Sequence, residues 1–502
     1  MVVSLFCGAL HGVDAYRVDL EIALARQGLP SFSMVGLVEG AAKEAHERVL
    51  AALRTCNFKL PPARITVNLA PSDRRKSGSG YDLPLAIGLL AAAGIIPSES
   101  LRGWFLIGEL SLSGEIRPVA GVLPMAILAR SEDVRGVIAS PGNAAEAAIA
   151  GIEAYGARTL LDVVAFLLGK APLGKVAAPA FDVHDEYLDF ADVHGQLHAR
   201  RALEIAAAGA HNVLMFGPPG SGKSMLAKRI PSILPPLSMD ETLEVTKIYS
   251  VAGLLEERGF VSCRPFRSPH HTVSDRALVG GGTAPRPGEV SLAHRGVLFL
   301  DELPEFGRNK LDVLRQPLED GRVIISRTLQ KVTFPSDCML VAAMNPCPCG
   351  YLTDPGHKCV CSHVQVMRYR ARISGPLLDR IDLHVAVPPV PVEQLQDGEA
   401  GESSAAIRER VLAARERQTH RFAGTNFHTN ADIYGRQLDS FCHLGKQEQD
   451  FLRGVMHRLN FSARAYTRIL RVARTIADLA GSENIAAHHL AEAVGFREFD
   501  RK

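Results

Sequence analysis

The sequence has almost no net charge, few aromatic residues and no long apolar run. Its 502 residues include 56 Lys and Arg against 54 Asp and Glu, a balance of +2, and 47% are hydrophobic. This excludes a globally basic nucleic-acid coat and a disordered acidic tail, but it leaves room for a local basic surface. The nearest approach to a membrane span, residues 83–96, is interrupted by a proline and two glycines and is too short.

The start of the chain also lacks the features of a secretory signal. It has no basic segment, and His11 and Asp14 interrupt its apolar run. The nine cysteines are unevenly spread, whereas a secreted disulfide scaffold is shorter and more evenly cross-linked. We therefore expect a cytoplasmic protein.

Two breaks in composition divide the chain. Residues 169–187 are rich in Ala, Pro and Gly, and residues 387–404 pass from prolines into a polar, acidic stretch. The length alone favours about three domains. We expect these domains to be residues 1–180, 188–392 and 400–502.

The first and last segments differ in their hydrophobic patterns. In the first, β-like runs alternate with Ala-rich helical patterns, which predicts an α/β domain. Within it we expect strands at residues 65–68 and 106–109 and a helix over 82–93. In the last segment, residues 404–418 and 463–479 repeat apolar residues at helical spacing, which predicts an all-helical domain.

The middle segment contains a phosphate-binding pattern. In VLMFGPPGSGKSMLAKRI, an apolar run leads through glycines into a helical pattern, and G-x-x-x-x-G-K-S is satisfied. Such a loop points backbone N–H groups at phosphate oxygens, with the lysine reaching the β- and γ-phosphates and the serine reaching Mg²⁺. The expected ATP-binding residues are Gly217, Pro218, Pro219, Gly220, Ser221, Gly222, Lys223 and Ser224.

Two further strands end in polar residues suited to hydrolysis. GVLFLDE ends in Asp301, a candidate Mg²⁺ ligand with Ser224, and Glu302, a candidate base for the attacking water. CMLVAAMNP ends in Asn345, whose amide would orient that water. Alone, an acidic pair is often a solvated strand end, and an asparagine before proline is often a turn residue.

Four cysteines lie close together in the sequence just after Asn345. Cys347 and Cys349 form one C-x-C pair, and Cys359 and Cys361 form another. Four thiolates suit tetrahedral Zn²⁺, so we expect a structural zinc site, with buried free thiols as the alternative. His357 and His363 are candidates to replace one cysteine.

Three longer motifs carry a family resemblance. PGEVSLAHRGVLFLDELPEF (287–306), NPCPCGY (345–351) and RYRARISGPLLDRIDLHV (368–385) together resemble the magnesium-chelatase-like AAA+ ATPases, and more narrowly the ComM/YifB group. The resemblance runs nearly end to end. It implies a P-loop AAA+ module with a parallel sheet and a C-terminal helical lid, assembled as a hexameric ring.

The resemblance also implies two arginines at the nucleotide. In such rings a neighbouring subunit supplies an arginine finger, and Arg380 in SGPLLDRID matches it. Arg464 in SARAYTRIL matches the lid's sensor arginine, although Arg468 lies one turn away. The alternatives are an ion pair of Arg380 with Asp379 or Asp382, and a solvated helix face for Arg464.

The first domain resembles a protease without its catalytic groups. GSGYDLPLAIGLLAAAGIIP (78–97) and IGELSLSGEIRPVAGVLPMAI (107–127) resemble the Lon protease-type, S5 domain 2-like fold. Gly80 falls where the nucleophilic serine would stand, and Leu123 or Met125 where its lysine would stand. Because neither can do that chemistry, we expect a ring-forming or nucleic-acid-contacting platform.

Two basic insertions are candidates for contacting DNA. Residues 321–337 read as a hairpin, and related rings use such a hairpin to grip DNA, so Arg327 and Lys331 are candidate contacts. A second insertion, residues 264–288, reads as a mobile loop in which Arg267 is a candidate. Basic turns are also common on solvated hairpins.

The group resemblance implies a motor that moves branched DNA junctions during natural transformation and homologous recombination. Two other classes stay open. A magnesium-chelatase subunit does not usually carry a Lon-like domain before the P-loop. A protein-remodelling ATPase needs aromatic pore residues, for which Phe266 is the nearest candidate.

Overall fold

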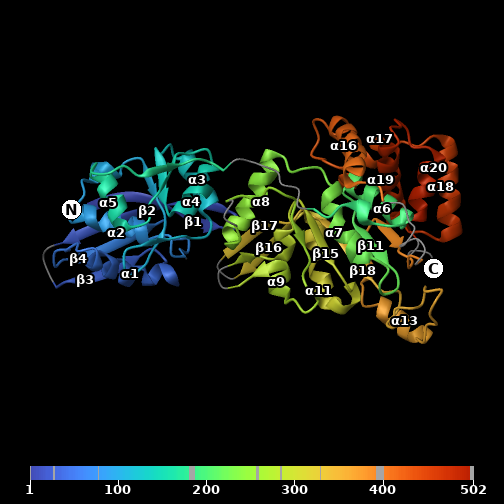
Figure 1. Ribbon diagram of the computed structural model, residues 1–502, viewed down its shortest axis with the longest axis horizontal. Helices are drawn as coiled ribbons and strands as arrows, with labels where there is room; N and C mark the ends of the chain where they lie inside the picture. The colour runs from blue at the N-terminus through green and yellow to red at the C-terminus, as the bar shows by residue number, and fades with distance from the viewer. Residues whose placement is uncertain are drawn as a thin grey trace.

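A computed structural model describes residues 2–25, 29–76, 78–179, 187–255, 259–282, 285–327, 330–391 and 401–497. The N-terminal part lies at one end of an elongated molecule, a parallel sheet lies in the middle, and the C-terminal helices lie at the other end (Figure 1). Within these ranges, every helix is too short or too polar to cross a membrane.

The N-terminal part begins with a four-stranded sheet of order β1-β2-β4-β3, in which β3 and β4 are parallel. The side chains of β2 alternate between buried and partly exposed, which is typical of a sheet with one covered face. Helix α2 packs on β1 and β2, and α1 packs on α2. The elements are β1 (Val2–His11), β2 (Asp14–Ala25), β3 (Ser31–Val35), α1 (Ala41–Thr55), β4 (Arg64–Ala70) and α2 (Asp82–Ala92).

A second four-stranded sheet, of order β10-β9-β8-β5, completes this part. The expected strand at 65–68 and helix at 82–93 are confirmed as β4 and α2. The expected strand at 106–109 is interrupted, because the backbone at Gly108 turns to pair with Gly80 and Leu83. The elements are β5 (Trp104–Leu106), β6 (Glu109–Leu110), β7 (Ile116–Arg117), α3 (Val122–Ser131), β8 (Gly136–Ala139), α4 (Pro141–Ala148), β9 (Ala154–Gly156), α5 (Leu160–Leu167) and β10 (Gly174–Val176).

The central sheet has five strands in the order β12-β15-β18-β11-β19, and every neighbouring pair is parallel. Strands β11, β15 and β18 are buried along their whole length, as expected for a parallel sheet covered on both faces. All carboxyl ends therefore meet at one edge and all amino ends at the other. The strands are β11 (Val213–Phe216), β12 (Phe266–Arg267), β15 (Val297–Leu300), β18 (Met339–Met344) and β19 (Leu383–Ala386).

Helices cover both faces of this sheet. One face and the C-terminal helices share a single apolar core, which includes residues of α6 and α7. A separate core lies on the other face. The helices of the middle part are α6 (Leu197–Gly209), α7 (Lys223–Ile233), α8 (Met239–Ala252), α9 (Asp275–Val279), α10 (Glu289–Leu292), α11 (Arg308–Val313), α12 (Arg315–Asp320), α13 (His363–Arg370) and α14 (Gly375–Leu378).

The C-terminal part is helical in its described residues, as predicted, and it is fastened to the sheet by buried polar groups. The His211 ring contacts the Thr475 hydroxyl at 2.8 Å on one side and the Asp382 carboxylate at 3.4 Å on the other. Since Asp382 directly precedes β19, these contacts attach the helices at the amino edge of the sheet. The helices are α16 (Ser404–Arg421), α17 (Gln437–Phe441), α18 (Lys446–Leu459), α19 (Ala463–Leu479) and α20 (Ala487–Gly495).

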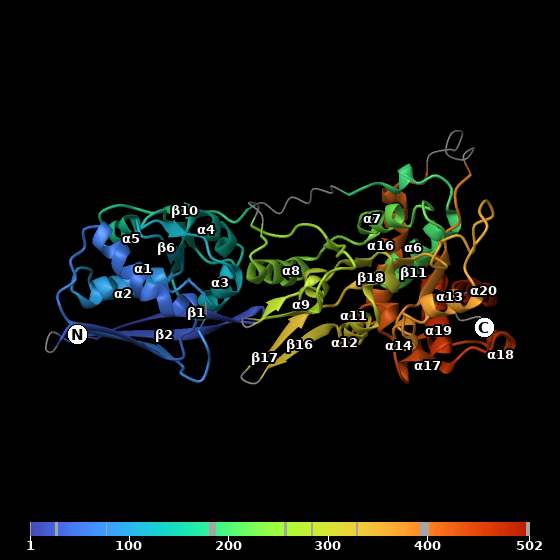
Figure 2. The same ribbon diagram turned by 90° about the horizontal axis from the view of Figure 1, so that it is seen from below.

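Among the described residues, the contacts between the N-terminal part and the middle part include a helix pair, a pair of hairpins and an ion pair between Asp14 and Lys247. Helices α3 and α8 pack together, and the Ser250 hydroxyl donates to the buried Glu146 carboxylate. The tip of the β1–β2 hairpin meets a second hairpin, β16 (Arg322–Arg327) and β17 (Gln330–Pro335), as Figure 2 shows. A Cβ on Gly12 would lie 2.9 Å from the carbonyl oxygen of Thr333. The N-terminal part therefore supports this second hairpin.

Candidate nucleotide-binding site

The predicted phosphate loop joins β11 to α7 at the carboxyl edge of the central sheet. Gly220 and Gly222 adopt φ angles of 76° and 90°, which a glycine takes without strain. Helix α7 begins at Lys223, so its free N–H groups face the loop. The local geometry is that of an anion-binding turn.

Lys223 is held inside this turn. Its ammonium group donates to the carbonyl oxygens of Gly217 and Pro218, each at 2.8 Å. Burial lowers the pKa of Lys223, and the Asp301 carboxylate opposes that shift. A bound phosphate would add negative charge beside the ammonium and favour its charged form.

The metal-binding candidates lie beside the loop. The Ser224 hydroxyl donates to the Asp301 carboxylate at 2.6 Å, although Asp301 follows a different strand, β15. A hydroxyl and a carboxylate in contact are the oxygen ligands that Mg²⁺ uses with nucleotide phosphates. Glu302 is exposed and adopts φ 51°, which turns the chain away from the strand.

Asn345 is the last of the predicted catalytic residues at the carboxyl edge of the sheet. It follows β18, and its side-chain oxygen lies 3.4 Å from the Lys223 ammonium. Three strands thus deliver Lys223, Asp301 and Asn345 to one place. A triphosphate on the loop would meet a cation, a metal-binding pair and an amide.

Two residues of this site were not predicted. The His271 ring lies 3.3 Å from the Glu302 carboxylate, although sequence reasoning placed this histidine in a basic loop. Gln196 donates to the Ser221 carbonyl at 3.2 Å and to the Pro388 carbonyl at 2.6 Å. It bridges the loop to the segment after β19, and its sequence carried no signal for that role.

Arg380 lies at the opposite edge of the sheet. It precedes β19, donates to the Pro376 carbonyl at 3.0 Å and pairs with Glu319 of α12. The four-residue strand β11 separates this edge from the phosphate loop by about 13 Å. Arg380 therefore does not reach the phosphate site of its own chain.

Arg464 lies on the same side as Arg380. It pairs with Asp379, and its side chain is 64% exposed. Arg468 is different: its side chain is 11% exposed, 3.6 Å from Asp382, and burial lowers its pKa to about 10. The exposed Arg464 is available to a ligand, whereas Arg468 belongs to the packing of α19 against the sheet.

Arg380 and Arg464 both border a groove of 980 Å³ that runs along the amino edge of the sheet. Its walls come from the residues before β11, β18 and β19 and from α12 and α19. The residues that line the groove include Asn212, Glu319, Asp379, Arg380, Arg464 and Arg468.

The predicted basic hairpin is present, and the described residues of the second insertion include strand β12 and helix α9, so that insertion is partly structured. In β16 and β17, Lys331 is exposed and pairs in register with Ser326, while the side chain of Arg327 lies outside the described residues. Arg267 lies in β12 and forms two hydrogen bonds with Glu289, at 2.7 and 2.9 Å. A contact with DNA would require that ion pair to break, so the structure gives Arg267 an intramolecular partner and its contact with DNA stays a prediction.

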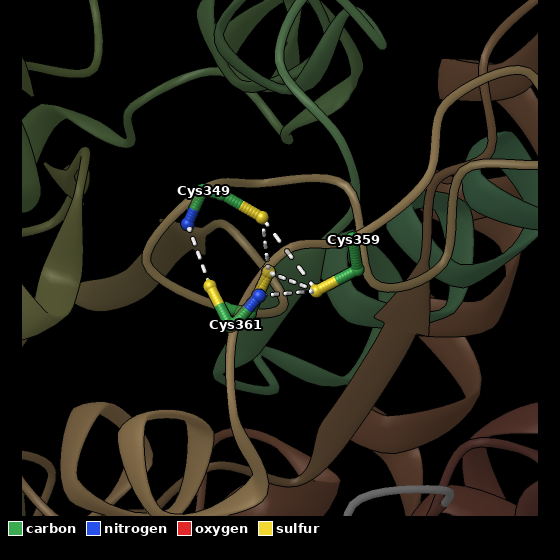
Figure 3. A group of neighbouring side chains, drawn as sticks. Cys349, Cys359 and Cys361 are labelled. Atoms are coloured by element: carbon green, nitrogen blue, oxygen red, sulfur yellow. Dashed lines mark hydrogen bonds between the residues drawn. The ribbon is translucent and has the colours of Figure 1, made fainter.

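The four clustered cysteines converge in the structure. Their sulfur atoms all lie within 4.8 Å of one another, in the loop that precedes α13. Figure 3 shows Cys349, Cys359 and Cys361 of this group. His357 does not join them, because its ring contacts Asp354 at 3.0 Å and lies tilted against the Tyr351 ring, with the centroids 4.8 Å apart. The expected ligand set is therefore the four cysteines, a group that suits one tetrahedral metal ion.

The N-terminal positions aligned with a protease dyad carry no reactive group. Gly80 has no side chain and packs near Ile107, while Leu123 and Met125 are buried apolar residues of α3. The nearby Lys76 is buried and donates to the Pro71 carbonyl. This lysine is used in loop packing.

Comparisons with known proteins agree along the whole chain. Residues 20–143 match the family described as subunit ChlI of Mg-chelatase, residues 189–395 match magnesium chelatase, subunit ChlI, and residues 401–497 match its C-terminal family. Competence protein ComM of Haemophilus influenzae is 47% identical over 99% of this chain and 97% of its own. The uncharacterized protein YifB of Escherichia coli is 44% identical over 98% of this chain and 96% of its own.

A more distant relative is the magnesium-chelatase 38 kDa subunit of Rhodobacter capsulatus. It is 26% identical over 31% of this chain and half of its own length. The full-length similarity is therefore to the ComM and YifB proteins. The chain belongs to the magnesium-chelatase-like AAA+ family, within its ComM/YifB group.

Proposed function

We propose that the protein hydrolyses ATP with Mg²⁺ as a hexameric ring and uses that energy to move branched DNA junctions in the cytoplasm. The work would serve natural transformation and homologous recombination. The observation that supports the proposal is that Lys223, Asp301 and Asn345 lie at one edge of the central sheet, whereas Arg380 and Arg464 lie at the other. Its relative from Haemophilus influenzae, called a competence protein, supports the biological setting.

The carboxyl edge supplies the hydrolytic half. Lys223 would bind the β- and γ-phosphates, and Ser224 with Asp301 would hold Mg²⁺. Glu302 would accept a proton from the attacking water, and Asn345 would orient that water and contact the γ-phosphate. The contact between His271 and Glu302 places a second titratable group beside the proposed base.

The amino edge supplies the other half to a neighbouring chain. Arg380 and Arg464 lie beyond β11 from their own phosphate loop, so they act in an adjacent subunit or not at the nucleotide at all. Each pairs with an acidic residue, Glu319 or Asp379, that would release it when a more highly charged triphosphate arrives. A closed ring satisfies every site with the same contact.

The β16–β17 hairpin is the proposed DNA contact. Its apolar residues Val323, Val332 and Phe334 are buried, whereas Lys331 is exposed. Lys331 would meet the phosphate backbone with Arg327, whose side chain lies outside the described residues, and the β1–β2 hairpin would support the middle of β17. We propose the N-terminal part as a Lon-like platform in which the protease dyad is replaced.

Two alternatives predict other outcomes. A chelatase-type motor would be stimulated by a metal-insertion partner, and a remodelling ATPase by an unfolded protein. The main proposal predicts that forked or four-way DNA stimulates ATP hydrolysis and that junctions move only with an active site. Stimulation by unfolded protein alone would favour remodelling.

We expect Glu302→Gln to lower kcat for ATP hydrolysis by about 10²–10⁴-fold while ATP still binds, because only the proton acceptor is lost. Lys223→Ala should lower kcat too and, unlike Glu302→Gln, should also weaken ATP binding. Phosphate release and fluorescent-nucleotide titration measure the two effects. Glu305→Gln is the matched control, because that exposed glutamate pairs with Arg372 and should leave turnover unchanged. Normal turnover in Glu302→Gln would contradict its assignment.

Mixing two inactive variants tests whether each nucleotide site is divided between two chains. Arg380→Ala mixed with Lys223→Ala should recover activity, since some interfaces then combine an intact phosphate loop with an intact arginine. A single finger is worth about 10³–10⁵ in rate, so recovery stands far above background. Glu302→Gln mixed with Lys223→Ala is the control, because both changes damage the same half. Equal recovery in both mixtures, or none in either when assembly is verified, would contradict the arrangement.

Lys331→Ala should lower DNA affinity and reduce the slope of log K against log salt by about 0.9 on duplex DNA, because one phosphate contact is lost. Fluorescence anisotropy at several salt concentrations measures the slope. Lys59→Ala, an exposed lysine of the N-terminal part, should leave it unchanged. An unchanged slope in Lys331→Ala would remove this residue from the DNA contact.

A further inference from the structure

We propose that Cys347, Cys349, Cys359 and Cys361 bind one Zn²⁺ ion and that this ion holds the phosphate loop and Asn345 in position. We call residues 347–361 the cysteine knuckle. Its metal binding follows from the cysteine geometry alone. Its effect on nucleotide binding rests on the proposed ATPase function.

The sulfur spacing fits one small ion. The Cys347 sulfur lies 3.4 Å from that of Cys349 and 3.7 Å from that of Cys359, and Cys349 and Cys359 are 3.6 Å apart. Four sulfurs at about 2.3 Å from a tetrahedral zinc ion lie about 3.8 Å from one another. A disulfide needs about 2.05 Å, and a cluster of several metal ions needs its ligands farther apart. The observed spacing therefore selects a single metal ion.

Backbone groups of the knuckle support the ligands. The Cys349 N–H points at the Cys361 sulfur, and the Cys361 N–H points at the Cys359 sulfur, each at 3.4 Å (Figure 3). Hydrogen bonds to ligating atoms fix their orientation and stabilise the thiolate form. Among the described residues near these sulfurs, no His, Asp or Glu enters the group. A tetrahedral site of four thiolates suits Zn²⁺, or iron in an iron–sulfur centre.

The knuckle is joined to the nucleotide site at both its start and its turn. Asn345 lies two residues before Cys347, and its side chain meets Lys223 at 3.4 Å. Gly350 lies against Pro219 of the phosphate loop, where a Cβ would come within 2.7 Å of the proline ring. The Gly350 N–H donates to the Cys347 carbonyl at 3.0 Å, which closes this turn.

Metal binding therefore fixes two contacts of the phosphate loop. With zinc bound, the Cys347–Cys349 turn is tied to the Cys359–Cys361 turn, and Gly350 is held against Pro219. Without zinc, those turns have no covalent or metal link, and the loop and Asn345 lose a fixed neighbour. A displacement of about 1 Å at a reacting centre can lower kcat by about 10²-fold.

Metal analysis of the full-length protein, purified in reductant, tests whether the cysteine knuckle binds zinc. We expect one zinc per chain, and after replacement with Co²⁺ we expect the absorption of a tetrahedral tetrathiolate. Cys359→Ser with Cys361→Ser should lose both signals, whereas Cys56→Ser with Cys263→Ser, outside the knuckle, should keep them. Zinc-free folded wild-type protein, iron in place of zinc, or a cobalt spectrum without thiolate ligands would overturn the proposal. Should the first double variant not fold, wild-type metal content and the cobalt spectrum still decide.

Hydrogen exchange and nucleotide binding test whether zinc holds the phosphate loop in position. Removing zinc from wild-type protein should speed amide exchange in residues 217–224 without any nucleotide present. Gly350→Ala should keep its zinc but raise the Kd for ATP, since its φ of 88° and the contact with Pro219 both oppose a side chain. Gly356→Ala is the matched control, because its nearest neighbour would be a carboxylate oxygen at 3.4 Å.

The outcomes separate the two proposals. Unchanged exchange after zinc removal would overturn the coupling even if ATP is hydrolysed normally. Faster exchange in a protein that hydrolyses no ATP would support the coupling and count against the proposed function alone.

Discussion

The parallel hydrogen bonding of the central sheet determines where each functional group of this protein can act. With β11, β15, β18 and β19 running in one direction, everything that follows a strand meets at one edge, and everything that precedes a strand meets at the other. The phosphate loop, the acidic pair and Asn345 follow strands. Arg380 precedes one, and the buried contacts of His211 fasten the C-terminal helices, with Arg464, on the same side. On the proposed function, a single chain would carry two half-sites that face different partners.

Neighbouring structures reinforce the two edges separately. The cysteine knuckle touches the phosphate loop through Gly350 and leads directly from Asn345, so with zinc bound it would stabilise the proposed hydrolytic edge. The N-terminal part contacts α8 and the middle of strand β17, so it supports the hairpin of the proposed DNA contact. On the proposed function, nucleotide and DNA contacts would be linked through one sheet and its two cores. Such a link is what an ATP-driven motor requires.

The hydrolytic half was predictable from sequence because its residues lie in short contiguous motifs. Lys223 and Ser224 are positioned by the turn that contains them, and Asp301 by the end of an apolar strand. Arg267 shows the limit: its basic surroundings predict a nucleic-acid contact, whereas its ion pair with Glu289, 22 residues away, becomes evident only in the fold. The choice between Arg464 and Arg468 likewise depended on burial, which helical periodicity alone did not assign. The interrupted strand at Gly108 arose from a tertiary contact that no local pattern encodes.

The central claim is that one chain by itself lacks a complete catalytic site. The most direct measurement is ATP turnover per chain across a range of protein concentrations, with assembly followed in parallel by analytical ultracentrifugation. The account predicts that dilute single chains bind ATP yet hydrolyse it about 10³-fold or more slowly than assembled chains, because the arginine comes from a neighbour. Turnover per chain that stays constant while the assembly dissociates would contradict it.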